Sequence, residues 1–98
     1  MTDKLIFKIL TAEQWRQAEA EGVFRGAPVD LSDGYIHFST AVQAQGTAVR
    51  HFAGMHDLVL AAVDAKKLGD RRVYEVSGGG ELFPHLYGVL DLAAVKWT

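Results

Sequence analysis

Polar side chains that could take part in chemistry gather within residues 33–40, Asp-Gly-Tyr-Ile-His-Phe-Ser-Thr. If this segment is a strand, Tyr35, His37 and Ser39 project from one face, because side chains alternate along a strand with a period of two. An imidazole nitrogen of His37 and the hydroxyl of Ser39 could then contact one ligand. A buried histidine bonded to a backbone carbonyl would explain the same pattern, and the spacing favours neither interpretation.

Two more polar side chains stand in apolar surroundings in the second half of the chain. Glu75 interrupts residues 73–76, Val-Tyr-Glu-Val, and could act as a general base or accept a hydrogen bond from a ligand hydroxyl. A glutamate that faces solvent from a half-exposed strand is an equally good interpretation. His85 lies within residues 82–88, Leu-Phe-Pro-His-Leu-Tyr-Gly, where packing explains the aromatic residues but not the histidine.

Two other kinds of site are weaker candidates. Residues 77–80, Ser-Gly-Gly-Gly, could cradle a phosphate with backbone N–H groups, but they lack the lysine and the helix of a P-loop. A hairpin connection is the better interpretation. Four histidines could bind a metal, but His51 and His56 lie five residues apart, which does not place them on one helical face. No cysteine and no H-E-x-x-H motif accompanies them, so we expect no metal site.

The elements that would position these side chains follow in chain order. Residues 4–10 alternate in a way typical of a mostly buried strand. Thr11 and Gln14 have the spacing of a capping box and predict a short amphipathic helix that ends at Gly22. Residues 23–33 are rich in turn formers and predict an irregular loop, which could lie over a pocket.

A second helix is predicted directly after the strand that carries His37. Thr40 and Gln43 repeat the capping-box spacing, and Gly54 would end this helix. The remaining apolar segments predict strands at residues 57–63, 71–76 and within 89–97. Helices in the first half and strands in the second predict an α+β fold rather than a doubly wound sheet.

Composition limits the function classes. The chain has 98 residues, of which 49% are hydrophobic, and we expect one domain over residues 1–98. Ten basic and twelve acidic residues give a net charge of -2 without a charged run, so no nucleic-acid or anionic-membrane surface is predicted. Without cysteine there is no disulfide or thiolate site. No signal peptide or membrane-length apolar run is visible, which predicts a cytoplasmic protein, either a monomer or a weak homodimer.

Two sequence blocks carry a resemblance to a known family. Gly-Tyr-Ile-His-Phe-Ser at residues 34–39 and Phe-Pro-His-Leu-Tyr-Gly at residues 83–88 resemble the bacterial domain of unknown function 952, and the likeness extends from about Leu5 to about Val95. That family looks similar to a small member of the ADP-ribosyltransferase fold. The resemblance implies a split mixed or antiparallel β-sheet with two main helices in the N-terminal half. Residues 36–39, Ile-His-Phe-Ser, are also similar to a Val-His-Leu-Ser segment of the RNA 2'-phosphotransferases.

The resemblance also implies a function. A cleft would bind NAD or an ADP-ribose-like nucleotide, and the reaction would be ADP-ribosyl or glycosyl transfer, with no other cofactor required. His37, Glu75 and His85 would be catalytic, with Glu75 near a ribose hydroxyl. The nucleotide would be bound by Tyr35, Ser39, Thr40 and Tyr87.

The chain departs from its relatives at two points, and a second interpretation stays open. Lys8 stands where relatives often carry a histidine, and the arginine-rich phosphate grip of the phosphotransferases has no clear counterpart. The alternative is a non-catalytic module that binds a small ligand in the same cleft, or a partner protein through exposed Phe83 and Trp97. The enzyme interpretation predicts that four polar side chains converge: His37, Ser39, Glu75 and His85.

Overall fold

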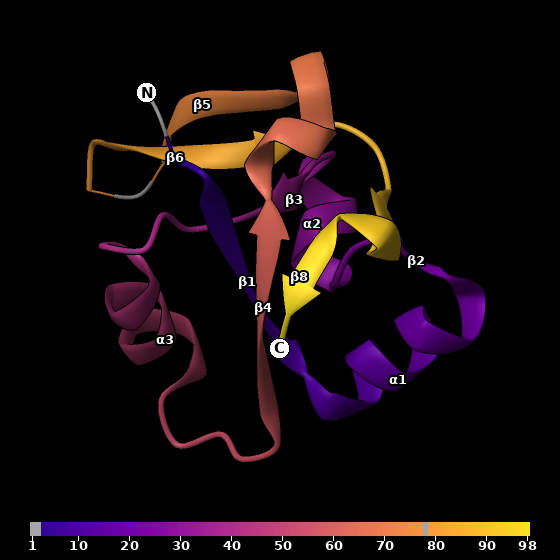
Figure 1. Ribbon diagram of the computed structural model, residues 1–98. Coiled ribbons are helices and arrows are strands. Elements are labelled where there is room, and N and C mark those ends of the chain that lie inside the picture. Colours follow the sequence, from indigo (N-terminus) through magenta and orange to yellow (C-terminus); the bar gives the residue numbers. More distant parts are fainter. Residues whose placement is uncertain (1–2, 78) are drawn as a thin grey trace.

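The computed structural model describes residues 3–77 and 79–98 (Figure 1). Gly78, within the glycine run considered for phosphate binding, lies outside the described residues. In chain order the elements are β1 (Leu5–Thr11), α1 (Ala12–Glu21), β2 (Val23–Phe24), α2 (Pro28–Asp33), β3 (Ile36–His37), α3 (Ala44–Phe52), β4 (Leu58–Asp64), the 3-10 helix η1 (Ala65–Arg71), β5 (Arg72–Ser77), β6 (Glu81–Leu86), β7 (Leu90–Asp91), the 3-10 helix η2 (Leu92–Ala94) and β8 (Val95–Trp97).

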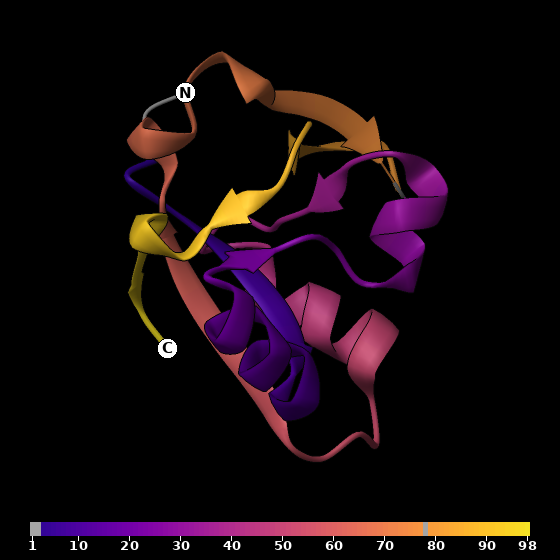
Figure 2. The same cartoon turned by 90° about the vertical axis from the view of Figure 1, so that its right-hand side faces the viewer.

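The described strands form three small sheets with the orders β1-β4-β8, β2-β7 and β3-β6-β5. Every strand pairing in this part of the chain is antiparallel, so the α+β class is confirmed without the mixed pairing that was one of the expectations. The apolar strand β4, which was predicted at residues 57–63, lies between β1 and β8. Figures 1 and 2 show α1 and α3 on opposite sides of β1.

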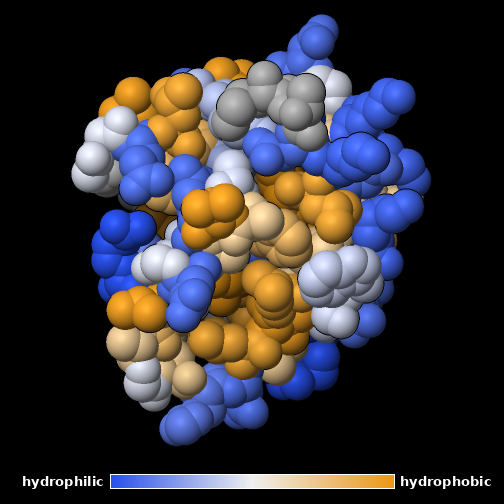
Figure 3. Space-filling model, turned by 60° about the vertical axis from the view of Figure 1, so that its left-hand side comes forward, coloured by the Kyte–Doolittle hydropathy of each residue, from blue (hydrophilic) through white to orange (hydrophobic). Residues whose placement is uncertain are grey.

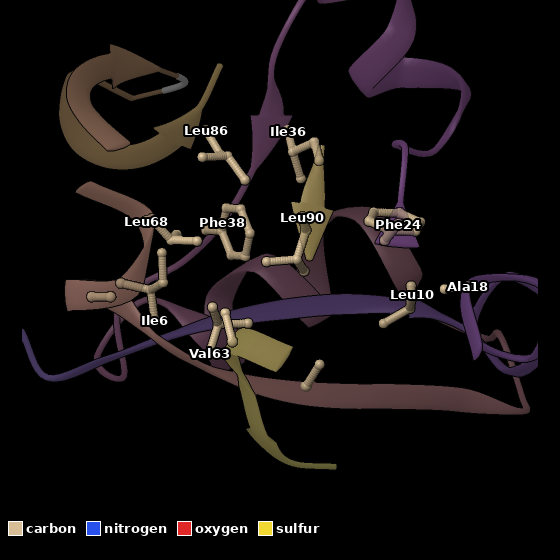
Figure 4. Packing of buried hydrophobic residues seen from close by; sticks show 13 residues of the cluster. Ile6, Leu10, Ala18, Phe24, Ile36, Phe38, Val63, Leu68, Leu86 and Leu90 are labelled. Atoms are coloured by element: carbon tan, nitrogen blue, oxygen red, sulfur yellow. The ribbon is translucent and has the colours of Figure 1, made fainter. Parts of the chain in front are cut away.

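The hydrophobic core lies between the β1–β4 pair and the β3–β6 pair. Figure 4 shows Ile6 and Val63 pointing toward Phe38 and Leu86. All four side chains are buried, with at most 3% of their surface exposed. Burying side chains of this size contributes about 1.5–3 kcal/mol each, so this packing holds the two sheets together.

Helix α1 confirms the predicted capping signals. The hydroxyl of Thr11 accepts from the N–H of Gln14 at 3.1 Å, and the Gln14 side chain accepts from the N–H of Thr11 at 2.9 Å. Gly22 ends the helix in the left-handed conformation, with φ 80°. A reciprocal cap and a glycine stop are local signals, which is why the sequence alone locates this helix well.

Helix α2 corrects the prediction that residues 23–33 are irregular. Pro28 stands at the start of the helix, and Asp30 Oδ2 accepts from the N–H of Ala27 at 2.7 Å. Gly34 ends the helix with φ 89°. These are ordinary start and stop signals, but a six-residue helix has too few apolar positions to show a helical period.

The segment around His37 is held on both sides rather than forming a long strand. The N–H and C=O of Ser39 each bond to the backbone of Phe7 at 2.8 Å, and the N–H of Phe38 donates to the carbonyl of Pro84 at 2.9 Å. The predicted bonds between Thr40 and Gln43 are present, at 3.0 and 3.3 Å, but they close a turn before α3. The segment therefore joins the sheet of β1 to the sheet of β6.

Candidate functional site

One face of the β3-β6-β5 sheet collects most of the candidate side chains. His37 lies opposite His85 across the β3–β6 pair, and His85 lies opposite Val73 across β5–β6. Residues directly opposite one another share a face, and so do residues two apart along a strand. The same face therefore carries Tyr35, Glu75 and Tyr87, while Ile36 and Leu86 point from the other face into the core.

The rings on this face form a contiguous cluster. Tyr35 stacks on His85 with ring centroids 4.1 Å apart and an interplanar angle of 25°. The ring of His37 lies 4.7 Å from that of Tyr35 and meets the His85 ring edge-on at 5.4 Å. Tyr87 lies 5.3 Å from Tyr35. These contacts fix the planes of both imidazoles.

Glu75 holds one side of the His85 ring. Glu75 Oε1 lies 2.7 Å from His85 Nδ1 and accepts from the Tyr87 hydroxyl at 2.7 Å. The hydrogen bond with His85, followed by that from Tyr87, lowers the pKa of Glu75, and the same bond to Glu75 raises the pKa of Tyr87. His85 is 1% exposed, and no described residue hydrogen-bonds its other ring nitrogen, Nε2. The pair therefore leaves one buried polar atom unsatisfied.

Both ring nitrogens of His37 lie close to a carboxylate. Nδ1 is hydrogen-bonded to Asp30 Oδ1 at 2.6 Å. Nε2 lies 2.9 Å from Asp33 Oδ2, a distance at which the two groups form an ion pair only when the ring is protonated. Helix α2 supplies both carboxylates, which explains why this short helix matters for the site.

Asp30 is the centre of a buried polar network. Besides His37 Nδ1 and the N–H of Ala27, it accepts from the N–H of His37 at 3.1 Å and pairs with Lys8 Nζ at 3.0 Å. Burial would raise the pKa of Asp30, but the Lys8 ammonium and these hydrogen bonds lower it overall. Burial lowers the pKa of Lys8, against the effect of Asp30. Lys8 also donates to the carbonyl of His37 at 2.9 Å, so the network orients the His37 backbone as well as its ring.

A cavity of about 630 Å³, which we call the α3 hollow, lies between α3, β1 and the start of α2. His37, Ser39 and His85 line it, and so do Thr47, Arg50 and His51 of α3. The three α3 residues are spaced at i, i+3 and i+4, which places them on one helical face. The apolar part of the wall includes the rings of Phe7, Phe52 and Phe83. Figure 3 shows this side of the molecule, where apolar side chains cover the middle and polar ones surround them.

The predicted site residues therefore separate into three groups. His37, Ser39 and His85 meet in the α3 hollow. Outside its wall, around His85 on the same sheet face, lie Tyr35, Glu75 and Tyr87. Thr40 belongs to neither group, since it does not line the hollow and its hydroxyl accepts from the N–H of Gln43. Glu75 therefore contacts His85 rather than the hollow, which corrects the expectation that all four polar side chains converge there.

Three residues of this region were not predicted from the sequence. Asp30 was assigned to a loop, although its place three residues after Ala27 is the position from which a carboxylate caps a helix start. Arg50 lies three residues after Thr47 and could have been found from that spacing. Lys8 stood out only as a departure from relatives, and no local signal shows that it pairs with Asp30, 22 residues away.

Phe83 and Trp97, considered as a partner surface, have different surroundings. Phe83 is half-buried in the wall of the hollow. Trp97 is 50% exposed, and its ring lies 5.9 Å from that of Phe7. Within residues 3–77 and 79–98, no three side chains are grouped in a way that could hold a metal ion. No helix in the described part of the chain is long and apolar enough to cross a membrane.

Comparison with known proteins identifies the family. A family model described as "Protein of unknown function (DUF952)" matches residues 9–98. The crystal structure of protein CC0527 from Caulobacter crescentus is 48% identical, has a TM-score of 0.92, and is matched over 95% of this chain and 82% of that chain. Its solution NMR structure is 48% identical with a TM-score of 0.86, over 96% of this chain and 81% of that chain. A search of the curated proteins finds no match. Because the family model covers far more than half of the sequence, the chain belongs to the family of the "Protein of unknown function (DUF952)".

Proposed function

We propose that the α3 hollow binds a nucleotide of the NAD or ADP-ribose type. The observation that carries this proposal is that His37, Ser39 and His85 share one cavity wall with Thr47 and Arg50. A volume of about 630 Å³ suits a small-molecule site, for which roughly 300–1,000 Å³ is typical. The apolar part of the wall suits a base or nicotinamide ring, and the polar part suits ribose and phosphate.

The proposed reaction is ADP-ribosyl or glycosyl transfer. NAD, when bound, supplies an N-glycosidic bond whose electron pair would leave with the nicotinamide. Positive charge would develop on the ribose until its anomeric carbon bonds to the oxygen of an acceptor, which in the simplest case is water that then loses a proton to solvent. Glu75 does not touch the hollow, but its carboxylate contacts His85, which lines the hollow. Its negative charge would act through the imidazole and offset the charge on the sugar, as oriented dipoles and charges do in other active sites. Glu75 is then a positioning residue, and His85 is the catalytic one.

The other predicted residues have supporting roles in this proposal. Ser39 would contact ribose or phosphate, since its hydroxyl lines the hollow beside that of Thr47 at 2.7 Å. Tyr35 and Tyr87 would hold the His85 and Glu75 side chains in place instead of contacting the nucleotide directly. Thr40 would act through the turn that leads into α3.

A non-catalytic binding module is the second candidate, and a specific observation favours it. Both nitrogens of His37 already lie against carboxylates, at 2.6 and 2.9 Å, and the hydroxyl of Ser39 is already bonded to Thr47. A catalytic group needs a free atom in reach of the substrate. If His85 does not supply that atom, the hollow can bind a nucleotide without transforming it.

Ligand-observed NMR with NAD, ADP-ribose and a 2'-phosphorylated nucleotide tests the binding proposal. We expect saturation transfer to at least one of these ligands, and its loss in His37→Ala. His56→Ala is the matched control, because His56 is exposed and does not line the hollow. Binding that survives in His37→Ala, or that is lost equally in His56→Ala, would remove the hollow from consideration.

Turnover separates the two candidates. The enzyme candidate predicts that nicotinamide accumulates when the protein is incubated with NAD, and that Glu75→Gln slows its release. Chromatography of the free nicotinamide measures both effects. Binding without any release of nicotinamide would leave the non-catalytic module as the function.

A further inference from the structure

The hydrogen bonds at the two ends of β1 show which of its backbone groups point to β4. Just before the strand, the C=O of Lys4 accepts from the N–H of Ala65 at 3.1 Å. Just after it, the N–H of Ala12 donates to the C=O of Asp57 at 2.7 Å. Residues of an antiparallel strand direct their N–H and C=O groups alternately to its two sides. The even-numbered residues of β1 therefore bond to β4, and the odd-numbered residues point to the opposite edge.

That opposite edge is paired at one residue only partway along the strand. The N–H and C=O of Phe7 exchange bonds of 2.8 Å with those of Ser39, as in an antiparallel ladder. If this ladder continued, His37 would lie opposite Ile9. His37 instead pairs with β6, and side chains hold its N–H and C=O. The N–H and C=O of Ile9 are therefore left without a partner among the described residues.

The α3 hollow lies along this edge of β1. Its wall includes residues from both faces of the strand, with Phe7, Ile9 and Thr11 from one face and Lys8 from the other, and no described residue of β4. A cavity over one face of the sheet would be lined by one of these sets only. Figures 1 and 2 show α3 on the side of β1 that faces away from β4, so the hollow separates the open edge from α3.

The unused groups of Ile9 have a defined preference. A donor and an acceptor on one strand residue pair with the acceptor and donor of a residue in a second antiparallel strand. Extended peptides bind open sheet edges in this way, and pockets for their alternate side chains give specificity. Here the neighbouring surfaces are apolar, since Phe52 of α3 and Phe83 of β6 line the hollow. An extended segment with apolar side chains fits both the edge and the walls.

We propose that the α3 hollow accepts an extended apolar peptide segment, which adds to the edge of β1 and exchanges two backbone hydrogen bonds with Ile9. The segment continues the ladder that Ser39 begins. It runs antiparallel to β1, so its C-terminal end is directed toward Ser39. This inference goes beyond nucleotide binding and does not depend on it.

Amide hydrogen exchange in the free protein tests whether the edge is open. The N–H groups of Lys8 and Leu10 bond to β4, whereas that of Ile9 points away from it. We expect the Ile9 amide to exchange at least about 10-fold faster than these two neighbours, because it lacks a hydrogen bond. Equal protection of the three amides would overturn the inference, since Ile9 would then already have a partner.

NMR titration with a one-residue probe, acetylvaline methylamide, tests the pairing. The N–H and C=O of its valine match those of Ile9, and N-methylation of that valine removes the donor while keeping the apolar side chain. We expect the Ile9 amide resonance to move downfield with the probe, and N-methylation to weaken binding by at least about 3-fold. The capped pentapeptide acetyl-Gly-Val-Ile-Val-Gly-amide should bind at least about 10-fold more tightly, because it buries more apolar surface.

Two substitutions separate the backbone of Ile9 from its side chain. Ile9→Pro removes an N–H that does not bond to β4, and proline is tolerated at such an edge. Ile9→Val is the matched control, because it keeps the N–H and a similar side chain. Pentapeptide binding should be lost in Ile9→Pro and stay within about 3-fold in Ile9→Val. If Ile9→Pro does not fold, hydrogen exchange and titration of the unsubstituted protein decide the question.

The remaining outcomes separate this inference from the proposed function. An Ile9 amide that responds to neither peptide overturns the inference, and so does equal pentapeptide binding by folded Ile9→Pro and Ile9→Val. If NAD moves the Ile9 amide and the peptides do not, the edge belongs to the nucleotide site, and only the proposed function stands. If the peptides bind and no nucleotide does, the proposed function fails and this inference stands.

Discussion

The buried carboxylate of Asp30 permits a quantitative test of how the site is held. Asp30 is 2% exposed, and both of its oxygens are used. Oδ1 lies 2.6 Å from His37 Nδ1 and accepts from Lys8 Nζ at 3.2 Å, and Oδ2 accepts from the N–H of Ala27 at 2.7 Å. Replacing either oxygen therefore affects Lys8, His37 or the start of α2.

Asp30→Asn changes the charge with little change in size. Its NH2 group must replace one of the two oxygens, so a donor meets a donor whichever way the amide is turned. Lys8 would also be left buried without its counter-charge. Removing one member of a buried ion pair costs about 3–5 kcal/mol. For a domain of roughly 100 residues each kcal/mol shifts the melting temperature by about 4–8 °C, so a fall of at least about 12 °C is expected.

The double variant Lys8→Met/Asp30→Asn tests whether the cost comes from the unpaired charge. Methionine retains most of the apolar stem of Lys8 and needs no counter-charge. Replacing both members of a buried pair with uncharged groups is often close to neutral. The double variant should therefore be more stable than the sum of the single effects predicts, by about 2–3 kcal/mol.

Urea unfolding followed by tryptophan fluorescence measures these free energies, with Trp15 and Trp97 as probes. Asp70→Asn is the control, because Asp70 is exposed, and its change should stay within about 0.5 kcal/mol. A loss below about 1 kcal/mol in Asp30→Asn, or simple additivity in the double variant, would refute the view that a buried ion pair holds this site together.

Two further predictions concern pH and the backbone. Because the pKa of Asp30 is lower in the folded protein than its unfolded value of about 3.9, the unfolded state binds more protons at acid pH. The contribution of Asp30 is therefore present above about pH 4 and is lost as the pH falls through the lowered pKa of the folded state. Urea midpoints should fall as the pH is lowered below about 4, and fall less in Asp30→Asn; parallel curves would contradict this. Gly34 has φ 89° at the end of α2, so Gly34→Ala should destabilise the protein by about 1–2 kcal/mol. In Gly46→Ala, within α3, the new Cβ would lie 3.7 Å from the Arg50 side chain, an ordinary contact, so this variant should be more stable by up to about 1 kcal/mol. Equal effects of the two variants on the melting temperature would show that backbone conformation is not the cause.

Local signals account for the parts of this fold that were predicted well. Helix α1 begins with a reciprocal cap and ends at a glycine, and β4 is a continuous apolar run. Each signal lies within a few residues, and the physics that produces the element acts over the same distance. Helix α2 had local signals too, at Pro28, Asp30 and Gly34, but it is too short for apolar periodicity to support them.

The candidate site was predicted only in part because its contacts are distant in sequence. That Tyr35, His37 and Ser39 share a face follows from strand geometry, but the position of His85 opposite His37 depends on the register of β3 with β6. The contact of Glu75 with His85 was not predicted, because it too joins residues from two different strands. Its carboxylate was a candidate because it stands in an apolar strand, yet its partner His85 is set by the β5–β6 hairpin.

The two histidine–carboxylate pairs differ in how completely the ring nitrogens of the histidine are paired. Asp30 is buried and binds a cation, two backbone N–H groups and His37, whose second nitrogen is held by Asp33. Both ring nitrogens of that histidine lie against carboxylates of the protein, so its removal should be felt first in stability. The other pair is incomplete, because Glu75 orients His85 while no described residue hydrogen-bonds its buried Nε2. An unpaired buried nitrogen costs free energy, so the Glu75–His85 pair should contribute less to stability than the Asp30–His37 pair.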